Sequence, residues 1–444
     1  MKNVLLLGAG MVAPPLIRYL LENGFALTVA SDVPDRAARL IGGHSRGRSV
    51  PFDARDKDRL ENLVGEHDLA VSLLPAPLHP LVAEACIARR VPMVTTSYVS
   101  PEMRRLDEAA REAGIILLNE IGVDPGLDHM SAMRIIHDVE SRGGKVSSFK
   151  SYCGGLPAPD SNDNPWGYKF SWSPRAVCTA GKNSARWREN GREINIPGPD
   201  LFLNHHDVRV EGLGTLEAYP NRDSLAYLDT YDLHEIETMF RGTFRYPGWC
   251  DCMKKVVGLG LLGEEPVTYP TGMTLSEWMR TFLTVPDTGD LRADLARQLQ
   301  LEESSDVLDR FQWLGLMSDD LVAITGRPTT PLDVLAARLE QKMSYQPGER
   351  DMIVMCHYFT AKFPDGRTEE ITSTLIDYGQ PDGDSSMART VSYPAAIGAK
   401  LILEGAITDT GVHIPVRPEI YNPVLDELKT LGIAFSETSR CAGQ

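Results

Sequence analysis

The sequence predicts an α/β protein whose N-terminal third folds as a doubly wound parallel sheet. The first observation is a continuous apolar run, Val4 to Leu7, which a glycine-rich turn separates from a segment with apolar residues at helical spacing. The second is that short apolar runs and helical segments keep alternating up to residue 118. The third is that polar residues follow most of these runs. Strands separated by helical segments indicate parallel pairing, because a parallel neighbour needs a long crossover connection.

Five further apolar runs predict the remaining strands of this sheet. They are residues 26–30, 49–52, 69–74, 91–95 and 115–118. Their exits are Ser31-Asp32, Asp53, Pro75, Thr96-Ser97-Tyr98 and the segment NEIGVDPGLDHM at 119–130. Since ligands of such sheets lie beyond the carboxyl ends of the strands, we expect these exits to line one crevice.

The segment 119–130 is the most unusual of these exits. It places the carboxylates of Glu120, Asp124 and Asp128 around a bend of two glycines and a proline. A rigid bend with several carboxylates is typical of a loop that faces a ligand. We expect the Asp124 loop to border one end of this crevice.

The first turn has the pattern G-x-G-x-x-A of a dinucleotide-binding (Rossmann) fold. Gly8 allows a tight turn, Gly10 lets a pyrophosphate approach the backbone, and Ala13 lets the helix pack closely on the strand. Pro14 and Pro15 are compatible with a helix, because the amide hydrogens that they lack would be unpaired in its first turn.

The end of the second strand bears on the choice of cofactor. Asp32 lies 24 residues after Gly8, where a carboxylate accepts hydrogen bonds from the ribose hydroxyls and repels a 2′-phosphate. This favours NAD over NADP, although Arg36 nearby weakens the discrimination. The alternative is a solvated turn aspartate with no role in binding.

Size, charge and cysteine content exclude several classes of protein. A chain of 444 residues is expected to form two or three domains, and its net charge of −16 argues against nucleic acid and anionic membranes as partners. No stretch reaches the ~20 apolar residues of a membrane span, and a first strand at Asn3 leaves no room for a signal peptide, so a cytoplasmic protein is expected. The seven scattered cysteines favour reduced thiols. Cys250 and Cys252 form a C-x-C without a second pair at ligand spacing, so no metal site is expected.

Beyond residue 145 the pattern changes to short alternating runs with many turns and aromatic residues, which predicts a mixed or antiparallel sheet. A helical segment follows at 256–349, and alternation returns at 351–376. The last 60 or so residues are predicted to be helices.

Several motifs resemble, in the same order, those of the saccharopine reductase family, the glutamate-forming saccharopine dehydrogenases. They are GAGMVAPP, TTSYVSPEM, NEIGVDPGLDHM, SYCGGLPAPDSNDNPWGYKFSWS, AYPNRDS, FRGTFRYPGW and, late in the chain, FQWLGLMSDD, GERDMIV and STLIDYG. The likeness runs from residue 1 to about 430. It implies a Rossmann domain (1–124 and 390–444), a mixed-sheet α+β substrate domain (125–255 and 350–389) and an inserted helical domain (256–349).

The resemblance also implies a reaction, the reversible NAD(P)-dependent oxidation of saccharopine to L-glutamate and L-2-aminoadipate 6-semialdehyde. Hydride transfer and imine hydrolysis would achieve it, in the aminoadipate route of lysine biosynthesis. The partners are then these small molecules, with a homodimer as a possible assembly. Family members that use NADP place an arginine after the second strand, where this chain has Asp32, so NAD is expected and NADP stays the alternative.

Saccharopine is a secondary amine with three carboxylates, so its site needs cations. Arg222 and Arg245 are expected to bind carboxylates, because a guanidinium can hold a carboxylate bidentately. The alternative for either arginine is a surface salt bridge. The resemblance adds further substrate contacts, namely Ser97, Tyr98, Asp124, Thr243 and Phe244.

Three residues are candidates for catalysis, namely Asp124, Tyr98 and Cys153. Asp124 is preferred as acid/base or amine anchor, and its alternative is the N-cap of a helix that begins near Leu127. Cys153 is also typical of a small buried residue.

Cofactor contacts are predicted at the strand exits. They are Gly8, Ala9, Gly10, Met11, Val12, Ser31, Asp32, Val33, Asp53, Ala54, Leu74, Thr96, Ser97, Val123, Asp124, Pro125 and Trp172. Trp172 would stack in the crevice, and its alternative is a place in an aromatic core.

Two other functions are compatible with these motifs. One is an imine-forming reductase that joins an aldehyde to a different amino acid or a polyamine. The other is a non-catalytic nucleotide-sensing protein, which would not need Asp124, Arg222 and Arg245.

Overall fold

The computed structural model describes residues 1–441, which form two compact units. Unit 1 comprises residues 1–146 and the segment that begins at His357, and unit 2 comprises Ser147–Cys356. Unit 1 is therefore assembled from two separate stretches of sequence.

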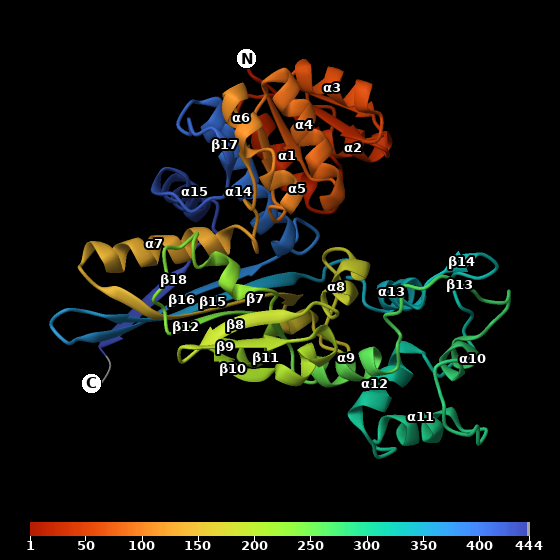
Figure 1. The fold of residues 1–444 in the computed structure, drawn as a ribbon. Helices are drawn as coiled ribbons and strands as arrows, with labels where there is room; N and C mark the ends of the chain where they lie inside the picture. Colours follow the sequence, from red (N-terminus) through yellow and green to blue (C-terminus); the bar gives the residue numbers. More distant parts are fainter. Residues whose placement is uncertain (442–444) are drawn as a thin grey trace. The chain divides into compact units, whose positions relative to one another are not determined.

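Unit 1 is built on a seven-stranded sheet with the order β17–β6–β5–β4–β1–β2–β3, in which all neighbours are parallel. In Figure 1 its strands are red to orange, apart from the blue β17. Its strands are β1 (Asn3–Leu7), β2 (Ala26–Ser31), β3 (Gly47–Pro51), β4 (Leu69–Ser72), β5 (Met93–Thr95), β6 (Ile116–Leu118) and β17 (Gly411–His413). The chain adds β2 and β3 on one side of β1 and then crosses to add β4, β5 and β6 on the other. Ligands of such sheets bind where the strand order reverses, which is between β1 and β4. The predicted doubly wound sheet is confirmed.

The helices of unit 1 are α1 (Ala13–Glu22), α2 (Pro34–Ile41), α3 (Lys57–Gly65), α4 (His79–Arg89), α5 (Pro101–Arg104), α6 (Asp107–Ala113), α7 (Leu127–Ser141), α14 (Ser386–Leu403) and α15 (Pro418–Thr430). Helices α1, α2, α4 and α14 are among those that contact strands of this sheet, and α15 packs on α7 and α14. One core cluster joins Leu5 and Leu7 of β1 to Val64 of α3 and Val82 of α4, all fully buried. α1 packs against α14, so the two stretches of unit 1 share one core.

The C-terminal region departs from the prediction of helices alone. Helices α14 and α15 are present, but β17 completes the parallel sheet beside β6, and β18 (Ser436–Cys441) pairs antiparallel with β16 (Thr368–Tyr378). β17 has three residues, and β18 has the polar sequence SETSRC. Neither segment has apolar residues at the alternating spacing of a strand. The strand conformation of both therefore depends on backbone hydrogen bonds to the neighbouring strand.

Unit 2 contains most strands of the mixed sheet that the sequence predicts. Its strands are β7 (Lys145–Pro157, which begins in unit 1), β8 (Ala185–Glu189), β9 (Arg192–Ile196), β10 (His206–Val210), β11 (Gly214–Pro220) and β12 (Thr238–Arg245). β10, β11 and β12 are antiparallel neighbours, β12 runs parallel to β7, and β8 is antiparallel to β9 and β12. β15 (Asp351–Lys362) belongs to unit 2 up to Cys356.

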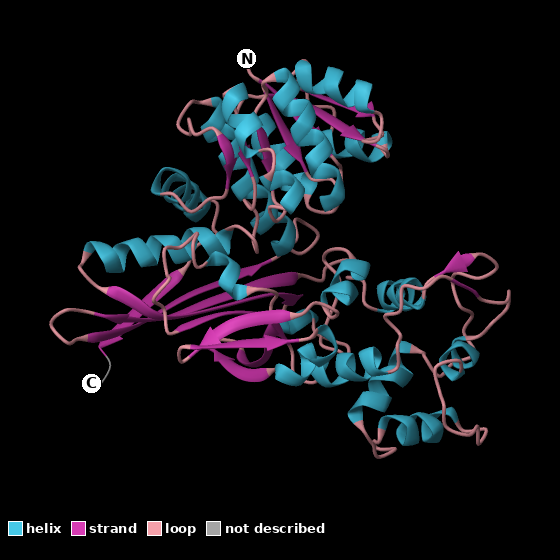
Figure 2. Cartoon of the chain, in the orientation of Figure 1, coloured by secondary structure: helices cyan, strands magenta, loops and turns pink. Residues whose placement is uncertain are grey.

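The remainder of unit 2 is mainly helical (Figure 2). Its helices are α8 (Pro174–Ala180), α9 (Trp249–Gly258), α10 (Leu275–Arg280), α11 (Leu291–Leu299), α12 (Asp306–Leu314) and α13 (Pro331–Lys342). Short 3-10 helices lie at Ala76–Leu78 in unit 1 and at Pro159–Ser161, Gly198–Asn204 and Ser224–Tyr227 in unit 2. The predicted helical segment also contains a two-stranded sheet, β13 (Val267–Thr268) with β14 (Pro328–Thr329). The three-domain division of the chain stays a prediction.

Candidate active site

The glycine-rich turn between β1 and α1 has the backbone that a dinucleotide site requires. Gly8 has φ +104°, and a Cβ there would lie 3.0 Å from the carbonyl oxygen of Leu73, so only glycine fits. A Cβ on Gly10 would have no heavy atom within 4 Å, which leaves that side of the backbone open to a phosphate. At the N-terminus of α1, Ala13 N donates to Gly10 O at 3.3 Å, and Pro14 and Pro15 have no amide hydrogen, so a phosphate would be bound by the backbone of the turn and not by that of the helix. These residues fit a dinucleotide cofactor.

The parallel pairing brings the predicted strand exits to one edge of the sheet. Leu7 of β1 is in register with Ala30 of β2 and with Ser72 of β4, and Ser72 is in register with Thr95 of β5. The residues after these positions include Gly8, Ser31, Leu74 and Thr96. The cofactor residues of unit 1 that the sequence predicts therefore follow strands that end at the same edge.

The turn after β2 presents one carboxylate to solvent. Ser31 is buried, and its hydroxyl oxygen accepts a hydrogen bond from Val33 N at 3.1 Å. Asp32 is exposed, and its Oδ1 accepts a hydrogen bond from the Ser31 hydroxyl at 3.3 Å. Asp53, after β3, is also exposed, and its carboxylate accepts a hydrogen bond from Arg55 N.

A buried histidine connects three of the polar residues near the strand ends. His79 Nδ1 is hydrogen-bonded with Ser72 Oγ at 2.9 Å, and its Nε2 lies 2.8 Å from Ser97 Oγ and 3.3 Å from Thr95 Oγ1. Burial lowers the pKa of His79 to about 4, so the ring is neutral near pH 7. One ring nitrogen then donates and the other accepts, which fixes the orientation of the Ser97 hydroxyl. The sequence gives no signal for this role, because His79 lies at the start of an otherwise apolar helix.

Protonation of His79 is expected to destabilise the protein in acid. The unfolded chain takes up this proton near pH 6.5, whereas the folded protein does so only near pH 4. The contribution of neutral His79 to the free energy of unfolding is therefore fully present above about pH 6.5. It decreases as the pH falls toward about 4, by up to about 3 kcal/mol in total. Urea unfolding at several pH values should show a shallower decline for His79→Gln than for the wild type. Parallel declines would contradict this assignment.

Tyr98 and Asp124 form a hydrogen-bonded pair in unit 1. The Tyr98 hydroxyl donates to Asp124 Oδ1 at 3.0 Å, and both residues are partly exposed. Asp124 is not the N-cap of α7, because that position belongs to Gly126, and no side chain caps the helix. A Cβ on Gly126 would lie 2.2 Å from the backbone of Gly122, so the loop around Asp124 closes tightly on itself.

The other two carboxylates of this segment are buried, which distinguishes them from Asp124. Glu120 is 5% exposed and Asp128 is 2% exposed. Val99 N donates to Glu120 Oε1 at 2.9 Å, and Gly126 N donates to Asp128 Oδ1 at 2.6 Å. Both carboxylates therefore hold the loop itself in place, and Asp124 is the one of the three that is partly exposed.

Arg222 lies in the turn that follows β11 in unit 2. It is exposed, and its backbone has φ +53°. Its carbonyl oxygen accepts a hydrogen bond from Arg186 N at 2.9 Å, and the guanidinium of Arg186 pairs with the carboxylate of Asp223 at 3.0 Å. The turn is thus held by neighbouring groups that leave the Arg222 side chain at the surface of unit 2.

Arg245, at the end of β12, is buried rather than part of a surface salt bridge, which excludes that alternative. It is 4% exposed, and its guanidinium carbon lies 4.9 Å from the centre of the Tyr168 ring, 5.4 Å from that of Trp249 and 5.6 Å from that of Tyr219. Its Nη1 donates to the carbonyl oxygen of Phe244, and its Nε has no hydrogen-bond partner among residues 1–441. Sequence reasoning missed the three rings, which come from separate elements.

Two neighbouring strands of unit 2 hold the other predicted substrate residues. Thr243 of β12 is in register with Cys153 of β7, and Phe244 is fully buried and stacked on Tyr152 at 5.1 Å between ring centres. Cys153 is itself buried. Trp172 is partly exposed and forms a hydrogen bond with the buried Tyr168.

Clusters of metal-binding side chains and membrane-spanning helices were looked for among residues 1–441. Among residues 1–441 no group of three or more histidine, cysteine, aspartate or glutamate side chains could hold a metal ion. Cys250 and Cys252 are buried, and burial raises the pKa of both thiols. No helix of the described chain is long and apolar enough to cross a membrane.

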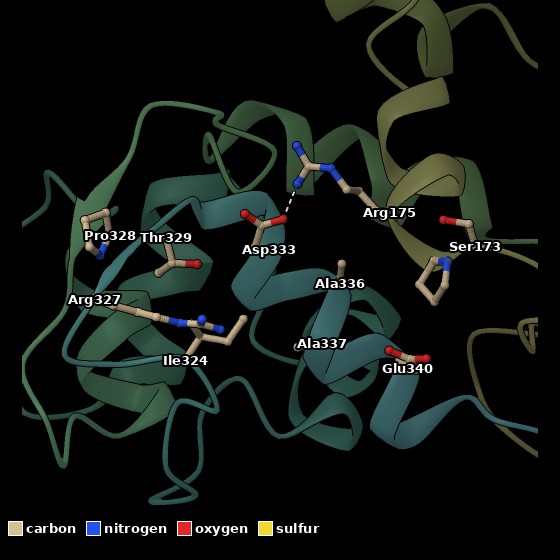
Figure 3. Close-up of a pocket in the computed structure, with 11 residues that line it drawn as sticks. Ser173, Arg175, Ile324, Arg327, Pro328, Thr329, Asp333, Ala336, Ala337 and Glu340 are labelled. Carbon is tan, nitrogen blue, oxygen red and sulfur yellow. Dashed lines mark hydrogen bonds and ion pairs between the residues drawn. The ribbon is translucent and has the colours of Figure 1, made fainter. Parts of the chain in front are cut away.

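Figure 3 shows a pocket in unit 2. It has a volume of about 440 Å³ and is lined by Ser173 and by residues of α8, α13, β14 and the segment before β14. Arg175 forms an ion pair with Asp333 across it, and Arg327 and Glu340 also line it. None of the predicted substrate or cofactor residues lines this pocket.

Two family models cover most of the chain. The saccharopine dehydrogenase NADP binding domain matches residues 4–118, and the saccharopine dehydrogenase C-terminal domain matches residues 122–433. The chain belongs to the saccharopine dehydrogenase family. This confirms the resemblance on which the sequence interpretation depends, and it supports a nicotinamide dinucleotide as cofactor.

Known saccharopine dehydrogenases match the chain over nearly its whole length. The saccharopine dehydrogenase (NADP(+), L-glutamate-forming) of Saccharomyces cerevisiae is 40% identical, and the match covers 96% of this chain and 97% of the relative. The protein of the same name in Schizosaccharomyces pombe is 39% identical, with 98% and 99% covered. The solved structure of apo saccharopine dehydrogenase (L-Glu forming) from Saccharomyces cerevisiae has a TM-score of 0.90 at 39% identity and covers 99% of this chain and 100% of that one.

Proposed function

We propose that this protein is a glutamate-forming saccharopine dehydrogenase, an oxidoreductase that acts on a CH–NH group. It oxidises saccharopine with a nicotinamide cofactor and water to L-glutamate and L-2-aminoadipate 6-semialdehyde, and it also catalyses the reverse reaction. The observation that carries this proposal is the near full-length match to relatives with that activity in their names. The reaction belongs to lysine metabolism.

The Tyr98–Asp124 pair supplies the proton transfers in this proposal. Asp124 accepts the proton of the substrate ammonium, which leaves the neutral amine from which a bound nicotinamide cofactor would take a hydride at the adjacent carbon. Water adds to the carbon of the resulting iminium ion, and the proton that it loses passes to solvent. Asp124 then returns its proton to the nitrogen of the carbinolamine, and the C–N bond breaks. The hydroxyl proton of the carbinolamine passes through the Asp124 carboxylate to the glutamate amine, which leaves as an ammonium group, and the aldehyde carbonyl remains. The Tyr98 hydroxyl orients the Asp124 carboxylate through their 3.0 Å hydrogen bond.

The substrate carboxylates are assigned to arginines of unit 2. Arg222 is exposed in its turn, and the buried Arg245 has a guanidinium Nε without a hydrogen-bond partner in the described part of the chain, so both guanidinium groups suit a carboxylate. Ser97, Thr243 and Phe244 are proposed to complete the substrate contacts. Cys153 stays a candidate that no observation singles out as reactive.

The cofactor is proposed to lie along the strand exits of unit 1, with its pyrophosphate at Gly8–Val12. Such a group supplies the hydride acceptor, and the residues of the chain orient it. The matching family model and the relatives carry NADP in their names. We propose that in this chain Asp32 shifts the preference to NAD. The support for it is an exposed carboxylate directly after β2, which would repel a 2′-phosphate.

Replacing Asp32 with arginine is expected to shift the preference toward NADP. The change exchanges a repulsive charge for one that can pair with the 2′-phosphate. The ratio of kcat/KM for NADP to that for NAD should rise by at least tenfold, and Asp35→Arg on α2 provides a control for added charge. An unchanged ratio would reject the role of Asp32.

A spectrophotometric assay tests the proposed function itself. Saccharopine should drive reduction of the cofactor, with NAD and NADP compared in parallel. In the reverse direction, aminoadipate semialdehyde should be consumed with glutamate and not with other amino acids or polyamines. Turnover with another amine alone would support a related imine-forming reductase, and no turnover with bound cofactor would support a nucleotide-sensing protein.

Location and assembly are inferred from the sequence alone. A cytoplasmic location can be tested by cell fractionation. A homodimer can be tested by light scattering of the purified protein.

A further inference from the structure

Glu120 makes hydrogen bonds on both sides of Tyr98. Its backbone N donates to the carbonyl oxygen of Ser97 at 3.1 Å, and its Oε1 accepts a hydrogen bond from Val99 N at 2.9 Å. Tyr98 therefore stands between two hydrogen bonds formed by a single residue. These bonds fix the backbone from which the Tyr98 hydroxyl reaches Asp124.

The second carboxylate oxygen of Glu120 is connected to the Asp124 side of the pair. His129 Nε2 donates to Glu120 Oε2 at 2.8 Å, and the side chains of His129 and Glu120 are 0% and 6% exposed. His129 lies in the first turn of α7, which begins directly after the Asp124 loop. Glu120 is thus hydrogen-bonded to the segments that carry both members of the Tyr98–Asp124 pair.

The backbone conformation of Glu120 indicates that a glutamate stands at this position because its carboxylate is needed there. Glu120 has φ +54°, in the left-handed region, where glycine or asparagine is preferred. The same position buries a carboxylate, which is costly unless that group is hydrogen-bonded. Both costs are offset by the hydrogen bonds to Val99 and His129.

We propose that Glu120 and His129 are positioning residues that set the geometry of the Tyr98–Asp124 pair. This inference rests on the proposed function and deepens it. Neither residue needs to touch the reacting atoms, because each acts through the backbone of a neighbouring segment. A displacement of about 1 Å in such a pair can lower the rate about 100-fold.

Three variants test the inference. Glu120→Ala should lower kcat for saccharopine about 100-fold, with less than a threefold change in the dissociation constant of the cofactor. Glu120→Gln keeps an oxygen that can accept the Val99 amide hydrogen, and it should retain kcat within about tenfold of wild type. His129→Asn is too short to reach Glu120 and should lower kcat in the same direction. It provides the test if Glu120→Ala does not fold.

A structural readout separates this inference from the proposed function. In the crystal structure of Glu120→Ala, or of His129→Asn, without substrate, the distance from the Tyr98 hydroxyl to Asp124 should exceed hydrogen-bond reach. An intact pair, or kcat within threefold of wild type, would overturn the inference. A similar loss of kcat in Glu120→Gln and Glu120→Ala with equal weakening of cofactor binding would also overturn it. Failure of the wild type to oxidise saccharopine would reject the proposed function and leave the structural test valid.

Discussion

Replacing Asp124 with asparagine is expected to lower kcat for saccharopine oxidation by about 100- to 10,000-fold. The side chain keeps its size and an oxygen that can accept the Tyr98 hydroxyl hydrogen, but it can no longer take up a proton. The measurement is the steady-state reduction of the cofactor at saturating saccharopine. Thermal unfolding of the variant should match the wild type, because Asp124 caps no helix.

Two companion variants make this result specific. Asp58→Asn removes one carboxylate from an exposed position of α3 in the same unit and should leave kcat unchanged. Tyr98→Phe removes the donor to Asp124 and should give a smaller loss than Asp124→Asn. If Asp124→Asn retained kcat within threefold, another group would have to transfer the protons.

Replacing Arg222 with alanine is expected to raise the KM for saccharopine roughly 10- to 150-fold. A hydrogen bond to a charged group is worth about 1.5–3 kcal/mol, and loss of a carboxylate contact that forms in both ground and transition state affects KM more than kcat. Initial rates at varied saccharopine and fixed cofactor would measure this change. The KM for the cofactor should stay within threefold.

The turn itself offers the control for Arg222. Arg186 holds the same turn through Asp223 and through the carbonyl oxygen of residue 222, but it is not proposed to contact the substrate. Arg186→Ala should therefore leave the KM for saccharopine within about threefold. A similar rise in both variants would mean that the shape of the turn, and not the Arg222 charge, determines substrate affinity.

Local patterns were sufficient to predict the parallel sheet of unit 1. Buried parallel strands are continuous apolar runs in the sequence. The tight turn at Gly8 needs a positive φ, and the glycine that allows it is recognisable in the sequence. Strand β17 could not be predicted in this way, because its three residues include one apolar side chain, Val412. Its strand conformation comes from pairing with β6, a contact between residues almost 300 positions apart in sequence.

Residue types predicted the chemistry of the candidate site better than its geometry. The sequence does not distinguish the carboxylates of Glu120, Asp124 and Asp128. In the structure, Glu120 and Asp128 are buried and accept hydrogen bonds from backbone amide groups. Burial depends on packing that a single sequence does not show. For the same reason the aromatic rings around Arg245 and the link from His79 to Ser97 were missed, since each joins residues from different elements.

The discontinuity of unit 1 has a consequence for protein synthesis. On the ribosome, residues 1–146 are made first. The face of α1 that α14 covers stays open until residue 403 has been translated, and the edge of β6 that β17 covers stays open until residue 413 has been translated. The nascent chain must therefore tolerate an incomplete sheet while all of unit 2 is made. A fragment ending near residue 146 would expose the same edge permanently, which makes it a poor substitute for the whole chain in nucleotide-binding studies.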